Sequence, residues 1–307
     1  MQNFNNNQNP NKKNAKFDSD SDNHLIRNDA AKRKKKSNKK FITEMVLIGV
    51  GILISLALIF NGQIRDFMIH QDQQESAQSL TKGAKNGNPR SSNQAKKNKQ
   101  MDNLRAKYRQ AVQNGDENEA KKLAKEINKK QPKGTTYDWK KVHPLSTTDA
   151  VKSRFNKNAA GSIGAVAIPN AGLYLPINAG VGDWAMSVGF GTFSPVQQMG
   201  VDNFPIAAHN LSTTGQLGAK LDYVHKGDKV YLTDLNNVYV YEVYHKGIFK
   251  PTATWVTNIN SNYHGNPVTV LITCHSWGST REIVFAQMIN QYPATKHSLR
   301  TFKNLYK

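Results

Sequence analysis

The sequence predicts a mostly β domain, either a barrel or a sandwich, that follows one membrane-spanning helix and a polar spacer. Three observations predict this architecture. Residues 45–60 are apolar and uncharged, residues 61–143 are rich in Gln, Asn, Lys and Ser, and from residue 144 onward short apolar runs alternate with turn-forming residues. A chain of 307 residues is long enough for one sizeable core with such accessory segments.

Residues 1–40 form a basic tail with a net charge of +7, and we expect this tail to be disordered. The net charge of the whole chain is +20, which would suit a nucleic-acid-binding protein. However, residues 61–143 contribute +9 and residues 144–307 only +5, so most of the excess lies outside the predicted folded domain. This distribution favours a topology signal or a solvated segment, and we expect no nucleic-acid partner.

The apolar run belongs to a predicted membrane anchor over residues 41–61. Its length approaches the ~20 residues that a helix needs to cross a bilayer. Seven Lys and Arg residues lie within 32–40, whereas Arg65 is the one early cation after the run and Asp66 offsets it. The positive-inside rule therefore predicts a cytoplasmic N-terminus and an extracellular remainder. A cleaved signal peptide and a buried core helix are the alternatives, but no small-x-small cleavage motif follows the run and its flanks are too polar for a core.

The spacer is predicted to span residues 62–143. Its first part, to residue 100, can bury little apolar surface, and we expect it to be flexible. In residues 101–130 apolar side chains recur at helical spacing, which predicts two short helices or a small helical hairpin. Pro132 and Gly134 end this pattern, so we place the domain boundary near residue 143, after a spacer that would lift the domain off the membrane.

Residues 144–307 form the predicted β domain. Many short strands separated by turn signals are typical of a barrel or a sandwich. Helical signals are weak, around 195–200 and 214–224. The expected strands are 163–168, 173–177, 205–208, 229–235, 238–249, 268–273 and 281–287.

Cys274 is the only cysteine, so no intramolecular disulfide can form. It follows the apolar strand 268–273, where a loop begins, and a thiol there needs a nearby base or cation to react as thiolate. His275 is adjacent, but neighbouring side chains in a strand point to opposite faces, whereas His209 ends another predicted strand. Arg281 opens the next strand and could stabilise developing negative charge. On these residues alone, an inert thiol, a structural or solvated histidine and a surface arginine are the more common interpretations.

Several separated motifs resemble those of sortases, in the order in which that family has them. Residues 270–274 are similar to the signature Thr-Leu-x-Thr-Cys, and an Arg follows the Cys seven positions later. Residues 207–210 resemble the family's Ala-Gly-His box. The other likenesses are Ile163-Gly164 with Ile168-Pro169, Leu175-Pro176-Ile177, Gly189 to Phe193, and residues 226–231. The resemblance covers residues 160–290 and departs at Val270, where Thr is usual, at Ala208, where Gly is usual, and in a shorter Cys-to-Arg loop.

The resemblance implies a closed eight-stranded sortase-type β-barrel over residues 144–307 and a membrane-anchored cysteine transpeptidase, most like class A. It implies that Cys274 attacks the Thr–Gly bond of a Leu-Pro-x-Thr-Gly-like sorting signal on a surface protein, that His209 transfers protons, and that Arg281 orients the peptide or its oxyanion. The acceptor would be an amino group of the peptidoglycan precursor lipid II or of a cross-bridge. Substrate-binding positions would be Ala207, Ile272 and Thr273, for which ordinary strand packing is the alternative.

The expected location is the Gram-positive cell membrane, with a single span and the catalytic domain outside. Residues 187–204 offer Asp202 as their one carboxylate and residues 250–268 offer none, so we expect no calcium site, no other metal and no cofactor. A further apolar run after the barrel, usual in pilin-polymerising relatives, is not expected. The rival functions are a hydrolytic cysteine peptidase and a non-enzymatic basic protein of the cell surface.

Overall fold

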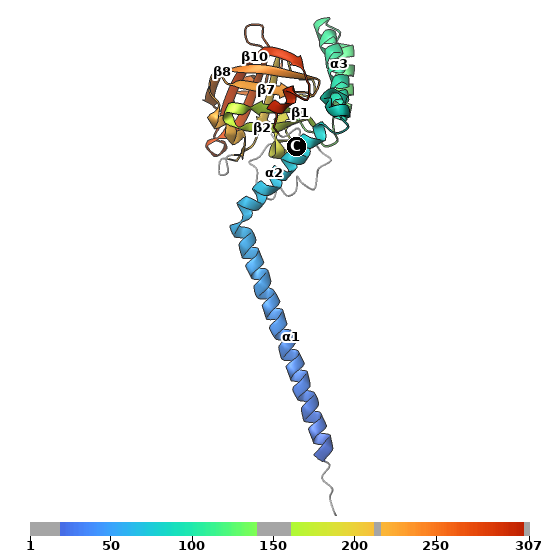
Figure 1. The fold of residues 1–307 in the computed structure, drawn as a ribbon, viewed down its shortest axis with the longest axis vertical. Coiled ribbons are helices and arrows are strands. Elements are labelled where there is room, and N and C mark those ends of the chain that lie inside the picture. The colour runs from blue at the N-terminus through green and yellow to red at the C-terminus, as the bar shows by residue number, and fades with distance from the viewer. Residues whose placement is uncertain (1–18, 140–160, 212–215, 304–307) are drawn as a thin grey trace, which may run out of the picture. The chain divides into compact units, whose positions relative to one another are not determined.

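The computed structural model describes residues 19–139, 161–211 and 216–303 (Figure 1). The chain divides into two units, residues 1–60 and 61–307. In the first unit a single helix, α1, runs over Ser19–Ile59. Among the described residues it holds the one segment, 32–59, that is long and apolar enough to cross a membrane. The helix begins within residues 1–40, the tail that the composition predicts to be disordered. Ala, Lys and Arg are strong helix formers, which accounts for the helix there.

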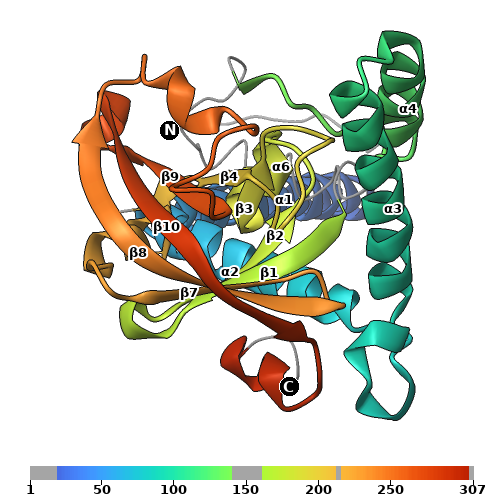
Figure 2. The ribbon, with the colours of Figure 1, turned by 90° about the horizontal axis from the view of Figure 1, so that it is seen from above.

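The second unit is built on a closed barrel with the strand order β1-β2-β3-β4-β9-β10-β8-β7 (Figures 1 and 2). Because the sheet is closed, the fold is the barrel and not the sandwich, which the sequence pattern also allows. A two-stranded sheet of β5 (Asn210–Leu211) and β6 (Gln216–Leu217) lies outside it. The barrel strands are β1 Ser162–Ile168, β2 Leu173–Asn178, β3 Phe190–Thr192, β4 Asn203–Ala208, β7 Lys229–Thr233, β8 Asn237–Phe249, β9 Val268–His275 and β10 Thr280–Pro293.

All seven expected strands are present, and the structure adds β3. This strand has three residues with a glycine at its centre, too few to show an alternating pattern. The helix α6 (Asp183–Val188) was also not predicted. Residues 195–200 form turns instead of the expected helix, and a 3₁₀-helix over Gly218–Tyr223 stands within the helical region predicted at 214–224.

Strand β9 has apolar side chains on both of its faces. Leu271 belongs to the cluster that fills the barrel interior, together with Phe204 and Tyr241. Val270 and Ile272 belong instead to a second cluster outside the sheet. Because successive side chains of a strand point to opposite faces, a strand of this kind must be covered on both sides. The outer cover is where the candidate site lies.

Three helices connect the first unit to the barrel: α2 (Asn61–Leu80), α3 (Asn93–Gln113) and α4 (Glu117–Lys129). The helical hairpin expected in residues 101–130 corresponds to α3 and α4. Residues 61–100, expected to be flexible, differ from that expectation because they pack on the barrel. Ile69 joins the interior cluster of the barrel, and Leu80 and Ala95 belong to one cluster with Phe302, which follows β10. The boundary predicted near residue 143 lies outside the described residues.

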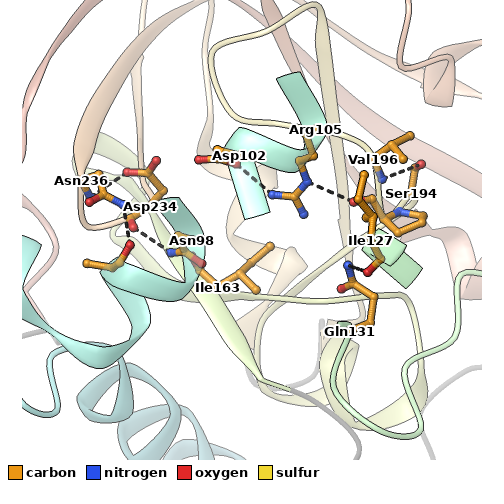
Figure 3. A network of polar contacts seen from close by, with 12 residues as sticks. Asn98, Asp102, Arg105, Ile127, Gln131, Ile163, Ser194, Val196, Asp234 and Asn236 are labelled. Carbon is orange, nitrogen blue, oxygen red and sulfur yellow. Dashed lines mark hydrogen bonds and ion pairs between the residues drawn. The ribbon is translucent and has the colours of Figure 1, made fainter. Parts of the chain in front are cut away.

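Helix α3 is fixed to the barrel by buried polar contacts (Figure 3). The Asn98 side-chain amide donates to the carbonyl oxygens of Ile163 and Asp234, at 2.7 Å each. The Arg105 side chain donates from Nε to Pro195 O at 3.0 Å and from Nη1 to Asp102 Oδ1 at 3.0 Å. These bonds satisfy carbonyls that would otherwise be buried without a partner, so the helix belongs structurally to the barrel.

Candidate active site

The β9–β10 hairpin places Cys274 and Arg281 side by side. The two strands are antiparallel, and Arg281 is the direct register partner of Cys274. Directly opposed residues of neighbouring strands project from the same face of a sheet. Both residues are half-buried. The thiol and the guanidinium are therefore anchored on rigid strands, at the point where the chain leaves the sheet.

The parallel pairing of β4 with β9 brings in the histidine. Ala207 pairs with Ile272 and Ala208 with Thr273. His209 is the next residue after β4, so it follows a strand whose last pair, Ala208 with Thr273, directly precedes Cys274. The strand pairings thus bring Cys274 and Arg281 together and place the backbone of His209 beside the end of β9.

His209 differs from the other two in its exposure, which is only 3%. Its backbone is held on both sides, since its N–H donates to Met186 O at 3.5 Å and its carbonyl accepts from Gly218 N at 2.8 Å. The imidazole is not among the groups that line the groove described next. His275, the alternative base, has its Nδ1 at 2.8 Å from Ser276 Oγ and at 3.1 Å from Thr280 Oγ1, where β9 ends and β10 begins.

A groove of about 280 Å³ opens beside Cys274 and Arg281. Five of the six residues singled out from the sequence line it: Cys274, Arg281, Ala207, Ile272 and Thr273. Ala208, Gly278 and Ile283 of the same strands and loop also line it, and the rest of the lining, mostly apolar, comes from three other parts of the chain. These are Trp139 before the barrel, the group of Val181, Met186 and Phe193 around α6, and residues 250–257 after β8.

Arg281 is held against the loop beside the cysteine. Its Nη1 donates to Gly278 O at 2.8 Å and to Thr280 O at 3.0 Å. A guanidinium has five N–H donors in a planar fork, so two bonds at one nitrogen do not exhaust it. The group can therefore offer further donors to a carbonyl or an oxyanion bound in the groove.

Thr273 ties the two strands of the site together. Its hydroxyl donates to Ala208 O at 3.0 Å, and the site is closed behind it by Gly218, where an added Cβ would lie 2.1 Å from Thr273 Oγ1. Asn210 Nδ2 donates to the Cys274 carbonyl at 2.7 Å. These contacts give Thr273 and Asn210 a structural part in holding the backbone that carries the thiol.

Two tryptophans near the groove were not predicted as site residues. Trp139 lines it from the spacer, and Trp255, in the segment after β8, stacks on Phe285 with ring centroids 5.9 Å apart. A tryptophan within a polar segment is the only signal in the sequence that points to either Trp139 or Trp255. Among the described residues there is no group of three or more His, Cys, Asp or Glu that could hold a metal ion.

Comparison with known proteins gives consistent matches. The model of a family described as "Sortase domain" matches residues 166–289. The chain is similar to Sortase A of Listeria monocytogenes, with 33% identity over 120 residues, covering 39% of this chain and 54% of that one. It is similar to Sortase A of Streptococcus agalactiae, with 32% identity over 165 residues, covering 52% of this chain and 66% of that one. The chain thus spans between half and two thirds of the length of these relatives.

Among solved structures, the barrel is similar to that of Listeria monocytogenes sortase A. The identity is 27%, the TM-score is 0.44, and the match covers 48% of this chain and 99% of that one.

Proposed function

Since this chain belongs to the sortase family, we propose that it is a membrane-anchored cysteine transpeptidase that joins surface proteins to the cell wall. The observation that supports this proposal is the register of β9 and β10, which pairs Cys274 with Arg281 beside a groove, together with His209 directly after the strand β4 that pairs with β9. A nucleophile, a proton carrier and a positive charge in such proximity are what acyl transfer requires.

In the first half-reaction the Cys274 thiolate attacks the carbonyl carbon of Thr in a Leu-Pro-x-Thr-Gly-like sorting signal. A C–S bond forms, the Thr–Gly C–N bond breaks, and the leaving amine takes a proton from the His209 imidazolium. Arg281, held at the loop by its bonds to Gly278 and Thr280, offers its other donors to the tetrahedral oxyanion.

In the second half-reaction an amine of the peptidoglycan precursor attacks the thioester. A new C–N bond forms, the C–S bond breaks, and the amine proton passes to His209, which restores the starting state. Because His209 is 3% exposed, we expect the histidine side of the groove to adjust when peptide binds.

The location follows from α1. Its apolar part, residues 41–59, would anchor the chain in the membrane, and the cations at residues 32–40 would keep the N-terminus in the cytoplasm. The barrel would then face the cell wall, where both the sorting signals and the amine acceptor are found.

The test uses the full chain in detergent micelles, with a quenched Leu-Pro-x-Thr-Gly peptide in the presence and absence of an oligoglycine amine. Wild type is expected to cleave after Thr and to form the joined product, which mass spectrometry identifies. Cys274→Ala is expected to lose at least about 10³-fold in rate, because no other thiol exists in the chain. Cleavage that ignores added amine would indicate a hydrolytic peptidase instead, and equal activity of the variant would overturn the proposal.

A further inference from the structure

The segment between α4 and the barrel reaches the groove. We call residues 131–139 the strap; in Figure 2 it is the green coil that leaves α4. At its end Trp139 lines the groove together with Cys274 and Arg281, and this tryptophan is 39% exposed. A residue from the predicted spacer is thus part of the candidate active site.

Hydrogen bonds fix the strap to the barrel. Val181 N donates to Thr136 O at 2.8 Å, in the loop that follows β2. The Tyr137 hydroxyl donates to Gln131 Oε1 at 2.9 Å, and burial raises the pKa of Tyr137 to about 12. The Val181 bond ties the strap to the barrel, whereas the Tyr137 bond holds the strap's own conformation, because Gln131 is itself part of the strap.

Close packing between the strap and the barrel also indicates that the strap is attached there. Gly180 has a φ of +78°, and a Cβ on it would lie 2.4 Å from Thr136 O. Glycine is therefore required there both for the backbone conformation and for the approach of the strap. The strap lies against a surface that is shaped to receive it.

We infer that the strap is a fixed wall of the peptide groove and that Trp139 is a substrate-binding residue that contacts an apolar side chain of the sorting signal. This inference rests on the proposed function. With the indole in place the groove still measures about 280 Å³, so Trp139 borders the space and does not fill it. Val181, Met186 and Phe193, which line the same groove, are apolar, and this suits an aliphatic side chain more than a charged one.

The experiment measures steady-state cleavage by the full chain in micelles for wild type, Trp139→Ala, Trp139→Phe and Tyr223→Ala. Tyr223 is the matched control, because it is an exposed aromatic residue, 58% exposed, that does not line the groove. Trp139→Ala is expected to raise KM about tenfold while kcat changes by less than about threefold, the pattern of lost binding that substrate and transition state share. Trp139→Phe is expected to recover most of the loss, and Tyr223→Ala to match wild type.

A second peptide, with Ser in place of Leu, sharpens the assignment. If the indole contacts the apolar side chain, Trp139→Ala weakens the Leu peptide more than the Ser peptide. An unchanged KM would overturn the inference. An increase in kcat/KM would overturn it as well, because it would show that Trp139 obstructs the groove.

Direct binding separates this inference from the proposed function. A labelled Leu-Pro-x-Thr-Gly peptide is titrated by fluorescence anisotropy into Cys274→Ala and into the double variant Cys274→Ala/Trp139→Ala, neither of which needs to react. A tenfold weaker Kd for the double variant supports the strap even if wild type cleaves nothing. Equal Kd values overturn the strap inference while leaving the transpeptidase proposal intact.

Discussion

The barrel carries two clusters of polar side chains that differ in what their groups do. At the α3 contact, Asn98, Arg105 and Asp234 are tied to backbone atoms or to one another (Figure 3). At the groove, the Cys274 thiol and the Arg281 guanidinium face a space large enough for a peptide. Burial raises the pKa of Asp102 and raises that of Asp234 to about 6, both at the α3 contact. A perturbed carboxyl therefore marks a structural junction here, and the open groove beside a nucleophile marks the candidate site.

The largest effect on catalysis is expected from replacing the histidine that is proposed to carry protons. We expect His209→Ala to lower kcat by about 10²–10⁴-fold, since it removes the group proposed to carry protons. His275→Ala is the matched control and should cost less than about tenfold, because its Nδ1 lies within bonding distance of Ser276 and Thr280 in the loop. Peptide cleavage rates measure both variants. The opposite ranking would transfer the proton-carrying role to His275.

Arg281→Lys tests the guanidinium at constant charge. We expect a loss of about 10²-fold in kcat/KM, because an ammonium cannot keep the two bonds to Gly278 and Thr280 and also reach the oxyanion. The free energy of unfolding should change by less than about 1 kcal/mol, since the side chain is half-buried at the rim. If Arg281→Lys lowers the free energy of unfolding strongly and leaves kcat/KM unchanged, the role of Arg281 is structural and not catalytic.

Changes at the α3 contact should alter the free energy of unfolding and leave the rate of peptide cleavage almost unchanged. An unfolded Asp ionises near 3.8, whereas Asp234 in the folded chain ionises near 6, mainly because it is buried. Between these values the unfolded state releases a proton that the folded state keeps, so stability falls as pH rises. This loss is on the order of 3 kcal/mol.

Asp234→Asn removes that ionisation. Chemical denaturation at pH 4 and pH 7 should show the variant gaining about 3 kcal/mol relative to wild type at the higher pH. The kcat of peptide cleavage at pH 7 should stay within about twofold of wild type. A difference that does not change with pH would contradict the assignment of the raised pKa to this residue.

The sequence predicted the strand residues that line the groove, and it missed the residues that border the groove from other parts of the chain. The strands that flank Cys274 and Arg281 and the apolar run before His209 are local patterns, and they form strands of the closed barrel. Trp139 reaches the groove only through contacts such as Thr136 with Val181, which join distant parts of the chain and leave no periodic trace. Likewise, α2 packs through a few residues such as Ile69 and Leu80, too few to outweigh its polar composition in a reading by pattern.

The parallel pairing of β4 with β9 has a consequence for how the protein matures. Its side-chain bonds, from Thr269 to Phe204 and from Thr273 to Ala208, each span 65 residues of chain. Contacts of such long range form late, because the entropy of closing the intervening loop must be overcome first. We therefore expect the pairing that carries Cys274 to be among the later features to assemble, so that a newly made chain completes the candidate site only when the barrel is nearly finished.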